Sequence, residues 1–301
     1  MSAEARPPSA WVFNLDAELE LATGARTPDA KVLARIPELT ASLRPLLAPG
    51  DVVVDRAGAA LAPGAYVGRA WCPTPSAIER LRDAGASPVP SPDVAVLRRV
   101  NHRRFAADLG QMLEGARYVD RLEDLCAAIE GESATGHWLL KRPFGFAGRG
   151  RRRVARGSLD PSARPWVLAS LAKGEGLQVE PWALRLGDFA LHGHVARGGA
   201  VVLGEPSRNV CDASGAWVES TRDADLEASE RRALVASAEL AGAALAAAGY
   251  FGPFGVDAFR YRAARGTAFN PRSEINARYS MGWAVGMGNV RPDLDLLPEV
   301  V

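Results

Sequence analysis

Apolar and polar positions divide the first third of the chain into short strands and one clear helix. The strand candidates are apolar runs bounded by polar, proline or glycine residues, as buried strands usually are. They lie at 11–15, 51–55 and 65–71. A helical pattern begins at Thr74 and Pro75, an N-cap residue followed by proline at the first helical position, and ends at Gly85. Strands that alternate with helices predict a small α/β domain.

The pattern changes after a proline-rich connector at 87–93, which is the best candidate for a domain boundary. Beyond it, amphipathic stretches alternate with strand-like runs joined by short turns, as in antiparallel hairpins. Expected helices lie within 94–113, 121–131 and 225–248, and expected strands at 137–144, 151–157, 176–184, 187–205 (two strands), 251–261 and from about Pro271 to 278. This mixture predicts an α+β architecture.

Composition narrows the class of protein. Apolar residues make up 48% of the 301 residues and the net charge is +1, so neither nucleic acid nor a membrane is an expected partner. No apolar run approaches the ~20 residues that span a bilayer. The three cysteines form no CxxC pair, which suits a reducing compartment. We therefore expect a cytoplasmic protein.

The basic residues are mostly arginine, and this changes how they are interpreted. Of 36 basic residues, the lysines are Lys31, Lys141 and Lys173. The arginine-rich run at 149–156 resembles a nucleic-acid patch, but the general arginine bias and the lack of interleaved aromatic residues argue against that function. Lysines are correspondingly more informative.

A glycine-rich loop follows the predicted strand that ends at Lys141. Its glycines are Gly145, Gly148 and Gly150, and glycine lets backbone N–H groups approach a phosphate closely. A lysine at the strand end adds a flexible positive charge. The spacing is not that of a GxxxxGK[ST] phosphate loop. A phosphate-binding lid and a solvated hairpin turn both remain open at this point.

The segment after the next predicted strand has groups that suit a nucleoside. Glu180 is a hydrogen-bond acceptor, the backbone of Trp182 and Ala183 offers groups for a purine edge, and Asp188 is placed to accept hydrogen bonds from a ribose diol. The alternative is a strand and tight turn with two surface acids.

The last two predicted strands bring carboxylates together. In 274–278, Glu274, Asn276 and Arg278 alternate with apolar residues, so the three polar side chains share one face. A hairpin places Asp257 beside Glu274. Magnesium favours one or two carboxylates completed by phosphate oxygens and water. These residues therefore predict a metal site, with Arg278 able to hold a phosphoryl group.

Two histidines and the absence of hydrolase motifs complete the survey. His192 and His194 alternate on one predicted strand, but two ligands are too few for a zinc site, so we expect them to face a cleft or a neighbouring strand. No G-x-S-x-G sequence is present, which gives no support to a serine hydrolase.

In this order, the motifs resemble those of the ATP-grasp superfamily, and the resemblance covers about residues 95–285. It implies a small amino-terminal α/β domain like the one that precedes many ATP-grasp domains, followed by two α+β subdomains that clamp ATP. We assign 1–95 to the first domain and 96–301 to the ATP-grasp domain. Within it we expect the lid subdomain at about 130–184 and the catalytic subdomain at about 185–301.

The resemblance also implies roles for individual residues. Those expected to bind ATP are Lys141, Gly145, Gly148, Gly150, Glu180, Trp182, Ala183 and Asp188, and those expected to bind magnesium, or manganese in its place, are Asp257, Glu274 and Asn276. Arg208 resembles the basic residue that meets the γ-phosphate, and it is grouped with Arg278 as catalytic. Arg103 stands where the family often has a second lysine.

The activity that this resemblance implies is an ADP-forming ligation. A small-molecule or peptide carboxylate would be joined to an amine or thiol through an acyl phosphate. A small-molecule kinase on the same fold and a non-catalytic ATP-binding regulator are the alternatives. The sequence leaves open whether the protein forms a homodimer.

Overall fold

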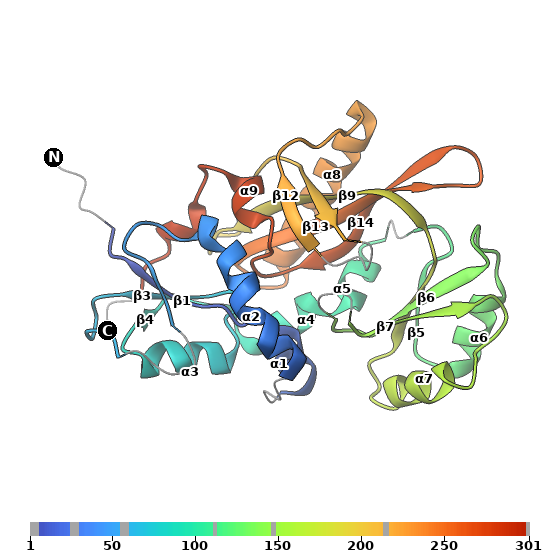
Figure 1. The fold of residues 1–301 in the computed structure, drawn as a ribbon, viewed down its shortest axis with the longest axis horizontal. Coiled ribbons are helices and arrows are strands. Elements are labelled where there is room, and N and C mark those ends of the chain that lie inside the picture. The colour runs from blue at the N-terminus through green and yellow to red at the C-terminus, as the bar shows by residue number, and fades with distance from the viewer. Residues whose placement is uncertain are drawn as a thin grey trace.

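The computed structural model describes residues 6–24, 30–54, 60–110, 113–145, 149–212 and 217–298. Three sheets form a larger body and a smaller unit beside it (Figure 1). The larger body holds both the amino-terminal and the carboxy-terminal sheets. The smaller unit, on the right in that view, contains the segment expected to be the lid subdomain and is called the lid below.

The amino-terminal domain is a parallel sheet with helices, as the alternating pattern predicts. Its strands are ordered β2-β1-β3-β4, and the described pairs are parallel. The strands are β1 (Ser9–Val12), β2 (Val52–Val53), β3 (Val67–Ala70) and β4 (Ser87–Pro88), and the helices are α1 (Ala17–Thr23), α2 (Ala30–Ser42), a 3₁₀ turn (Arg44–Leu46) and α3 (Pro75–Asp83). All residues of β1 and β3 are buried, including the polar residues Ser9 and Arg69.

Two details of this domain differ from the sequence prediction. The first strand begins at Ser9 and ends at Val12, so the second half of the predicted run is not strand. Thr74 stands at the N-cap of α3 but makes no capping hydrogen bond. Its hydroxyl instead donates to the Glu20 carboxylate of α1 at 2.7 Å. The threonine therefore ties two helices together.

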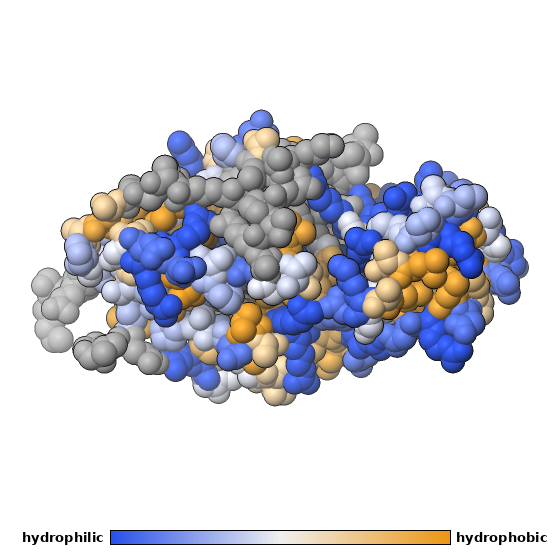
Figure 2. Space-filling model, turned by 90° about the horizontal axis from the view of Figure 1, so that it is seen from below, coloured by the Kyte–Doolittle hydropathy of each residue, from blue (hydrophilic) through white to orange (hydrophobic). Residues whose placement is uncertain are grey.

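The lid subdomain is an antiparallel sheet ordered β5-β8-β6-β7. Its elements are β5 (Arg117–Val119), α6 (Leu122–Glu130), β6 (His137–Lys141), β7 (Arg151–Ala155), α7 (Ala163–Leu171) and β8 (Leu177–Pro181). The pairing of β6 with β7 confirms the predicted hairpin. Seen from below, a hydrophobic area lies over the lid (Figure 2). Among the exposed apolar residues of the lid, Leu168 of α7 is 44% exposed. Helices α4 (Val94–Asn101) and α5 (Arg103–Asp108) connect the lid to the amino-terminal domain.

The carboxy-terminal sheet is ordered β12-β11-β9-β13-β14, with β10 paired to β9. Its elements are β9 (Leu184–Val195), β10 (Val201–Leu203), β11 (Ser207–Cys211), β12 (Trp217–Thr221), α8 (Ala228–Ala247), β13 (Gly252–Arg262), β14 (Thr267–Asn276), α9 (Trp283–Met287) and a 3₁₀ turn (Pro292–Asp295). Helix α8 begins with a capping box between Glu227 and Glu230. Its buried side chains pack on one face of the sheet, so the other face is left for a site.

The start of the last strand was predicted wrongly. β14 begins at Thr267 rather than near Pro271. The pairing with β13 shifts register between Asp257 and Phe259, and the residues passed over on β14 include Pro271. Proline is tolerated here because β14 is an edge strand and the irregularity removes the need for its missing N–H.

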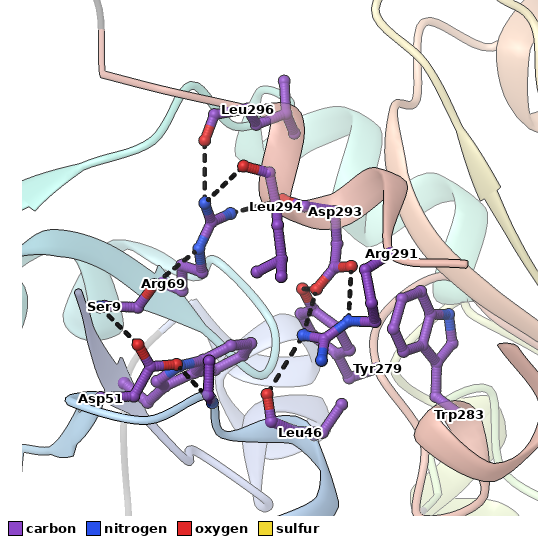
Figure 3. A network of polar contacts seen from close by, with 12 residues as sticks. Ser9, Leu46, Asp51, Arg69, Tyr279, Trp283, Arg291, Asp293, Leu294 and Leu296 are labelled. Carbon is purple, nitrogen blue, oxygen red and sulfur yellow. Dashed lines mark hydrogen bonds and ion pairs between the residues drawn. The ribbon is translucent and has the colours of Figure 1, made fainter. Parts of the chain in front are cut away.

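A buried polar network, here called the tail network, joins the last residues to the amino-terminal sheet (Figure 3). Its polar side chains are Ser9, Asp51, Arg69, Tyr279, Arg291 and Asp293. Arg69 of β3 donates to Ser9 Oγ at 3.1 Å and to the backbone carbonyls of Asp293 and Leu296 at 2.5 and 2.9 Å. The Asp293 carboxylate accepts from Tyr279 and from Arg291, each at 2.9 Å. The tail is therefore fixed by satisfied polar groups.

The helices of the described residues include none with both the length and the apolar character needed to cross a bilayer.

Candidate active site

A cavity of about 340 Å³ lies where the lid, the carboxy-terminal sheet and the amino-terminal domain meet. Eight of the residues singled out in the sequence line it: Arg103, Lys141, Gly145, Asp188, Asp257, Glu274, Asn276 and Arg278. They come from all parts of the chain after the first domain. The amino-terminal domain adds apolar side chains, including Leu15 and Trp71.

The carboxy-terminal sheet provides one wall of this cavity, and its polar residues Asp257, Glu274 and Asn276 are here called the floor. Asp257 and Glu274 are directly opposite one another on β13 and β14. Asn276 Nδ2 donates to Asp257 Oδ2 at 2.9 Å. Ile275 and Ala277 are buried between these polar positions, as the alternation predicts. The pairing of β13 with β14 thus brings Asp257 and Glu274 together although they are far apart in the sequence.

The two floor carboxylates have different electrostatic environments. Burial, together with the negative charge of Glu274, raises the pKa of Asp257 to about 6. Burial also acts to raise the pKa of Glu274, but the positive charges of Arg103 and Lys141 outweigh it, so that pKa is lowered. Arg103 Nη1 lies 2.9 Å from Glu274 Oε2. Glu274 therefore has its counter-charge within the protein, whereas no ion pair of Asp257 is found among the described residues.

The donor set of the floor fits magnesium. No group of three or more His, Cys, Asp or Glu side chains in the described ranges is arranged to hold a metal ion. Two carboxylates and one amide would leave most coordination positions to phosphate oxygens and water, which is the arrangement that Mg²⁺ prefers. The floor is thus suited to a metal that arrives with a nucleotide.

Arg278 lines the same cavity, but its side chain is hydrogen-bonded to a residue of the amino-terminal domain. Its Nε donates to Glu18 Oε1 at 2.5 Å, and its Nη2 donates to Asn276 Oδ1 at 3.0 Å. The strand ends at Asn276, so Arg278 lies beyond it. Through Glu18 of α1, the first domain fixes the position of this guanidinium.

Lys141 and Glu180 are paired with each other across neighbouring lid strands. Lys141 Nζ lies 2.6 Å from Glu180 Oε1, and both side chains are less than a tenth exposed. Burial lowers the pKa of Lys141 although Glu180 opposes that shift. Glu180 also accepts from Gln178 Nε2 at 3.0 Å. Lys141 lines the cavity, whereas Glu180 does not and lines a separate, much smaller one of about 10 Å³.

Arg103 and Asp188 each have an internal partner at the cavity. Besides its pair with Glu274, Arg103 donates from Nε to the Arg142 carbonyl at 3.0 Å. Asp188 accepts from Arg185 Nη1 at 2.6 Å. A nucleotide bound here would meet both arginines.

Several predicted residues are not brought to the cavity. The Trp182 N–H donates to the His137 carbonyl at 2.9 Å and its carbonyl accepts from Thr135, so both backbone groups are already used. Ala183 and Gly150 are also absent from the lining. Gly150, with a φ of 71°, closes the neck of the loop by accepting from the Arg142 N–H at 2.8 Å.

Arg208 faces away from the cavity, and Gly148 lies outside the described residues. Arg208 pairs with Asp225 at 3.4 Å. Because side chains alternate along β11, its neighbours Asn209 and Cys211 line the cavity instead.

Sequence reasoning assigned no function to several lining residues: His192, Asn209, Trp217, Ser280 and Met281. The alternation of His192 and His194 did point to a cleft, and His192 lines this one. Ser280 lies in an irregular segment shortly after β14, which ends at Asn276. Its position shortly after the polar strand was the one feature of the sequence that could have marked it as a lining residue.

No family profile matches the sequence, and no curated protein matches it. Solved structures do match. N5-carboxyaminoimidazole ribonucleotide synthetase from Thermus thermophilus has a TM-score of 0.52 at 17% identity, over 96% of this chain and 79% of that one. D-alanyl-alanine synthetase A from Vibrio cholerae gives 0.51 at 11% identity, over 95% and 92%.

Biotin carboxylase from Campylobacter jejuni has a TM-score of 0.53 at 12% identity, over 92% of this chain and 71% of that one. All three are ATP-grasp proteins. The likeness extends over the amino-terminal domain as well as the two later subdomains, because it covers more than nine-tenths of the chain in each case. The chain therefore has the ATP-grasp fold.

Proposed function

We propose that this protein is an ATP-dependent ligase that joins a carboxylate to an amine or thiol and releases ADP and phosphate. The observation that carries the proposal is the floor. Two carboxylates of unequal pKa and an amide face a cavity that also contains a buried lysine. Each of the similar enzymes named above has this fold, and two of them are synthetases by name.

The residues suit phosphoryl transfer, in which positioning and charge neutralisation do most of the work. Asp257, Glu274 and Asn276 would hold Mg²⁺, which when bound neutralises charge on the phosphates. Lys141 would bind phosphate oxygens once a nucleotide competes for it with Glu180. Arg278 would orient the transferred group. Trp71 and Leu15 would help to exclude water.

The reaction would proceed in two steps. An oxygen of the substrate carboxylate attacks the γ-phosphorus, and ADP leaves with the electrons of the broken P–O bond. The acceptor nitrogen or sulfur then attacks the carbonyl carbon, phosphate leaves with the electrons of the C–O bond, and the acceptor loses its proton to water. Neither step needs a covalent enzyme nucleophile, in agreement with the absence of a G-x-S-x-G motif.

The test is ADP release as a function of magnesium concentration, with a panel of carboxylic acids, for wild type, Asp257→Asn and Glu274→Gln. Turnover should fall about 100-fold or more in both variants, because each loses one negative charge that holds the metal. Glu175→Gln is a matched control, since Glu175 pairs with Arg98 and does not line the cavity. Wild-type magnesium curves in both floor variants would refute the proposal.

Trapping with hydroxylamine separates ligase from kinase, because only an acyl phosphate yields a hydroxamate.

A further inference from the structure

Two carboxylates of helix α1 are buried alike but differ in their partners. Glu18 is 5% exposed and Glu20 is 8% exposed. Both oxygens of Glu20 accept hydrogen bonds within the amino-terminal domain, from the Thr74 hydroxyl and from the hydroxyl and N–H of Ser76, at 2.5–2.9 Å. Glu18 accepts from Arg278 through Oε1, and its Oε2 has no hydrogen-bond partner in the described part of the chain. The interaction of Glu18 is therefore directed at a residue that lines the cavity.

Arg278 distributes its N–H groups over three acceptors. Nε donates to Glu18 Oε1, Nη1 donates to the Tyr279 carbonyl at 2.8 Å, and Nη2 donates to Asn276 Oδ1 at 3.0 Å. Nη2 also lies in ion-pair contact with Glu18 Oε1. Glu18 and Asn276 thus share the same end of the guanidinium, so a stronger bond to one of them is made at the expense of the other.

The guanidinium in turn decides which way the Asn276 amide faces. A guanidinium has donors and no acceptor, so it meets the amide oxygen, and the amide nitrogen is left to donate to Asp257 Oδ2 at 2.9 Å. A magnesium or manganese ion binds an amide through the oxygen. The readiness of Asn276 to join a metal site therefore depends on how strongly Arg278 holds that oxygen.

We propose that Glu18 is a positioning residue for the active site, which sets the metal affinity of the floor by drawing the Arg278 guanidinium away from Asn276. This assignment rests on the proposed function, because it takes the floor as the metal site. The proposed metal ligands all belong to the carboxy-terminal sheet. The amino-terminal domain thus acts on them through one carboxylate and two hydrogen bonds in series.

Loss of the Glu18 charge has two consequences of the same sign. The positive charge of Arg278 is no longer compensated, and it lies one hydrogen bond away from a metal ligand. The guanidinium also forms a stronger bond to the Asn276 oxygen when its carboxylate partner is weakened. Both effects weaken metal binding.

The test is a titration of the full chain with Mn²⁺ alone at about pH 7.5, in which electron paramagnetic resonance measures the unbound ion. Glu18→Gln keeps the shape of the side chain and removes its charge, so Mn²⁺ affinity should fall about fivefold or more. Glu18→Asp keeps the charge but shortens the side chain by one methylene group, so it should give a smaller loss.

Glu20→Gln is the matched control, because it removes a buried carboxylate from the same helix whose partners lie within the amino-terminal domain. It should leave Mn²⁺ affinity unchanged. Unchanged affinity in Glu18→Gln, or equal losses in Glu18→Gln and Glu20→Gln, would overturn the proposal.

Arg278→Met tests whether Glu18 acts through Arg278. In this background, Glu18→Gln should change Mn²⁺ affinity by less than about twofold, since its route to the floor has been removed. Equal losses with and without Arg278 would mean that Glu18 acts through its own field, and would overturn the positioning role.

Glu274→Gln separates this proposal from the proposed function. Since Glu274 belongs to the floor, its variant should lose most of the Mn²⁺ binding. If it does so and Glu18→Gln does not weaken binding, the positioning role alone fails. If Mn²⁺ binding is absent or does not depend on Glu274, the floor is not the metal site and both proposals fail together.

Discussion

The tail network and the floor are two polar clusters that differ in burial: Arg69 and Asp293 of the tail network are buried, whereas Asp257 and Glu274 of the floor are half-buried. In the tail network, Asp293 accepts from Tyr279 and Arg291, and Arg69 distributes its N–H groups over Ser9 and the backbone carbonyls of the tail. In the floor, Asp257 accepts one side-chain hydrogen bond, and its pKa is raised to about 6. A polar network in which every group is hydrogen-bonded rigidifies a structure, whereas a network with unsatisfied groups is able to bind a ligand.

The largest expected effect is on the completed cluster. Arg69→Ala should lower the free energy of unfolding by about 3–5 kcal/mol, because it leaves several buried carbonyl groups without donors. Urea unfolding followed by circular dichroism measures this. Arg121→Ala is the control, since Arg121 pairs with Glu123 at the exposed surface and its loss should leave the free energy of unfolding nearly unchanged. Equal losses in the two variants would show that the tail network does not stabilise the fold.

The next effect concerns Lys141, which is outside the floor but lines the same cavity. Lys141→Met keeps chain length but removes the charge, so ATP affinity and turnover should fall together, by about 100-fold in kcat/KM. Since this leaves Glu180 buried without its partner, Lys141→Met with Glu180→Gln gives a neutral pair of similar shape. Lys173→Met, at an exposed position, is the control. If the folded double variant binds the nucleotide with unchanged affinity, Lys141 is not part of the nucleotide-binding site.

How much the sequence predicts also differs between the two clusters. The floor was predictable because strict alternation along β14 and a hairpin bring Glu274 opposite Asp257. The tail network was not, because it joins Arg69 to residues more than 220 positions away through contacts that no periodic pattern encodes. Local rules locate elements, and long-range packing decides which polar groups meet.

The third prediction distinguishes the two floor carboxylates. Burial moves the pKa of Asp257 from an ordinary 3.8 to about 6, so ionised Asp257 is less favourable in the folded state than in the unfolded state. The destabilisation is complete above about pH 6 and disappears below about pH 4. Asp257→Asn should therefore gain about 1–2 kcal/mol at neutral pH and lose this advantage as the pH falls.

Glu274→Gln should behave in the opposite way, because it deprives buried Arg103 of its partner. Measuring unfolding free energy at several pH values between about 4 and 7.5, without metal, compares both variants directly. A gain in Glu274→Gln and a loss in Asp257→Asn at neutral pH would reverse the assignment of the destabilised charge.

The smallest expected effect tests whether Glu180 recognises the base. Glu180 is committed to Lys141 and Gln178 in this structure, so it can accept from an adenine amino group only after that pairing is exchanged. If it does so, Glu180→Gln replaces a carboxylate by an amide that can also donate to the carbonyl of guanine. The preference for ATP over GTP should then narrow by about tenfold or less, the value of one hydrogen bond.

Competition titrations with ADP and GDP give the ratio of the two nucleotide affinities independently of turnover. Gln178→Glu is the complementary variant: it adds a carboxylate next to Glu180 while leaving Glu180 itself in place, so it should keep the preference. A ratio that is equal in wild type and Glu180→Gln would place base recognition on backbone groups alone and leave Glu180 as the counter-charge that holds Lys141.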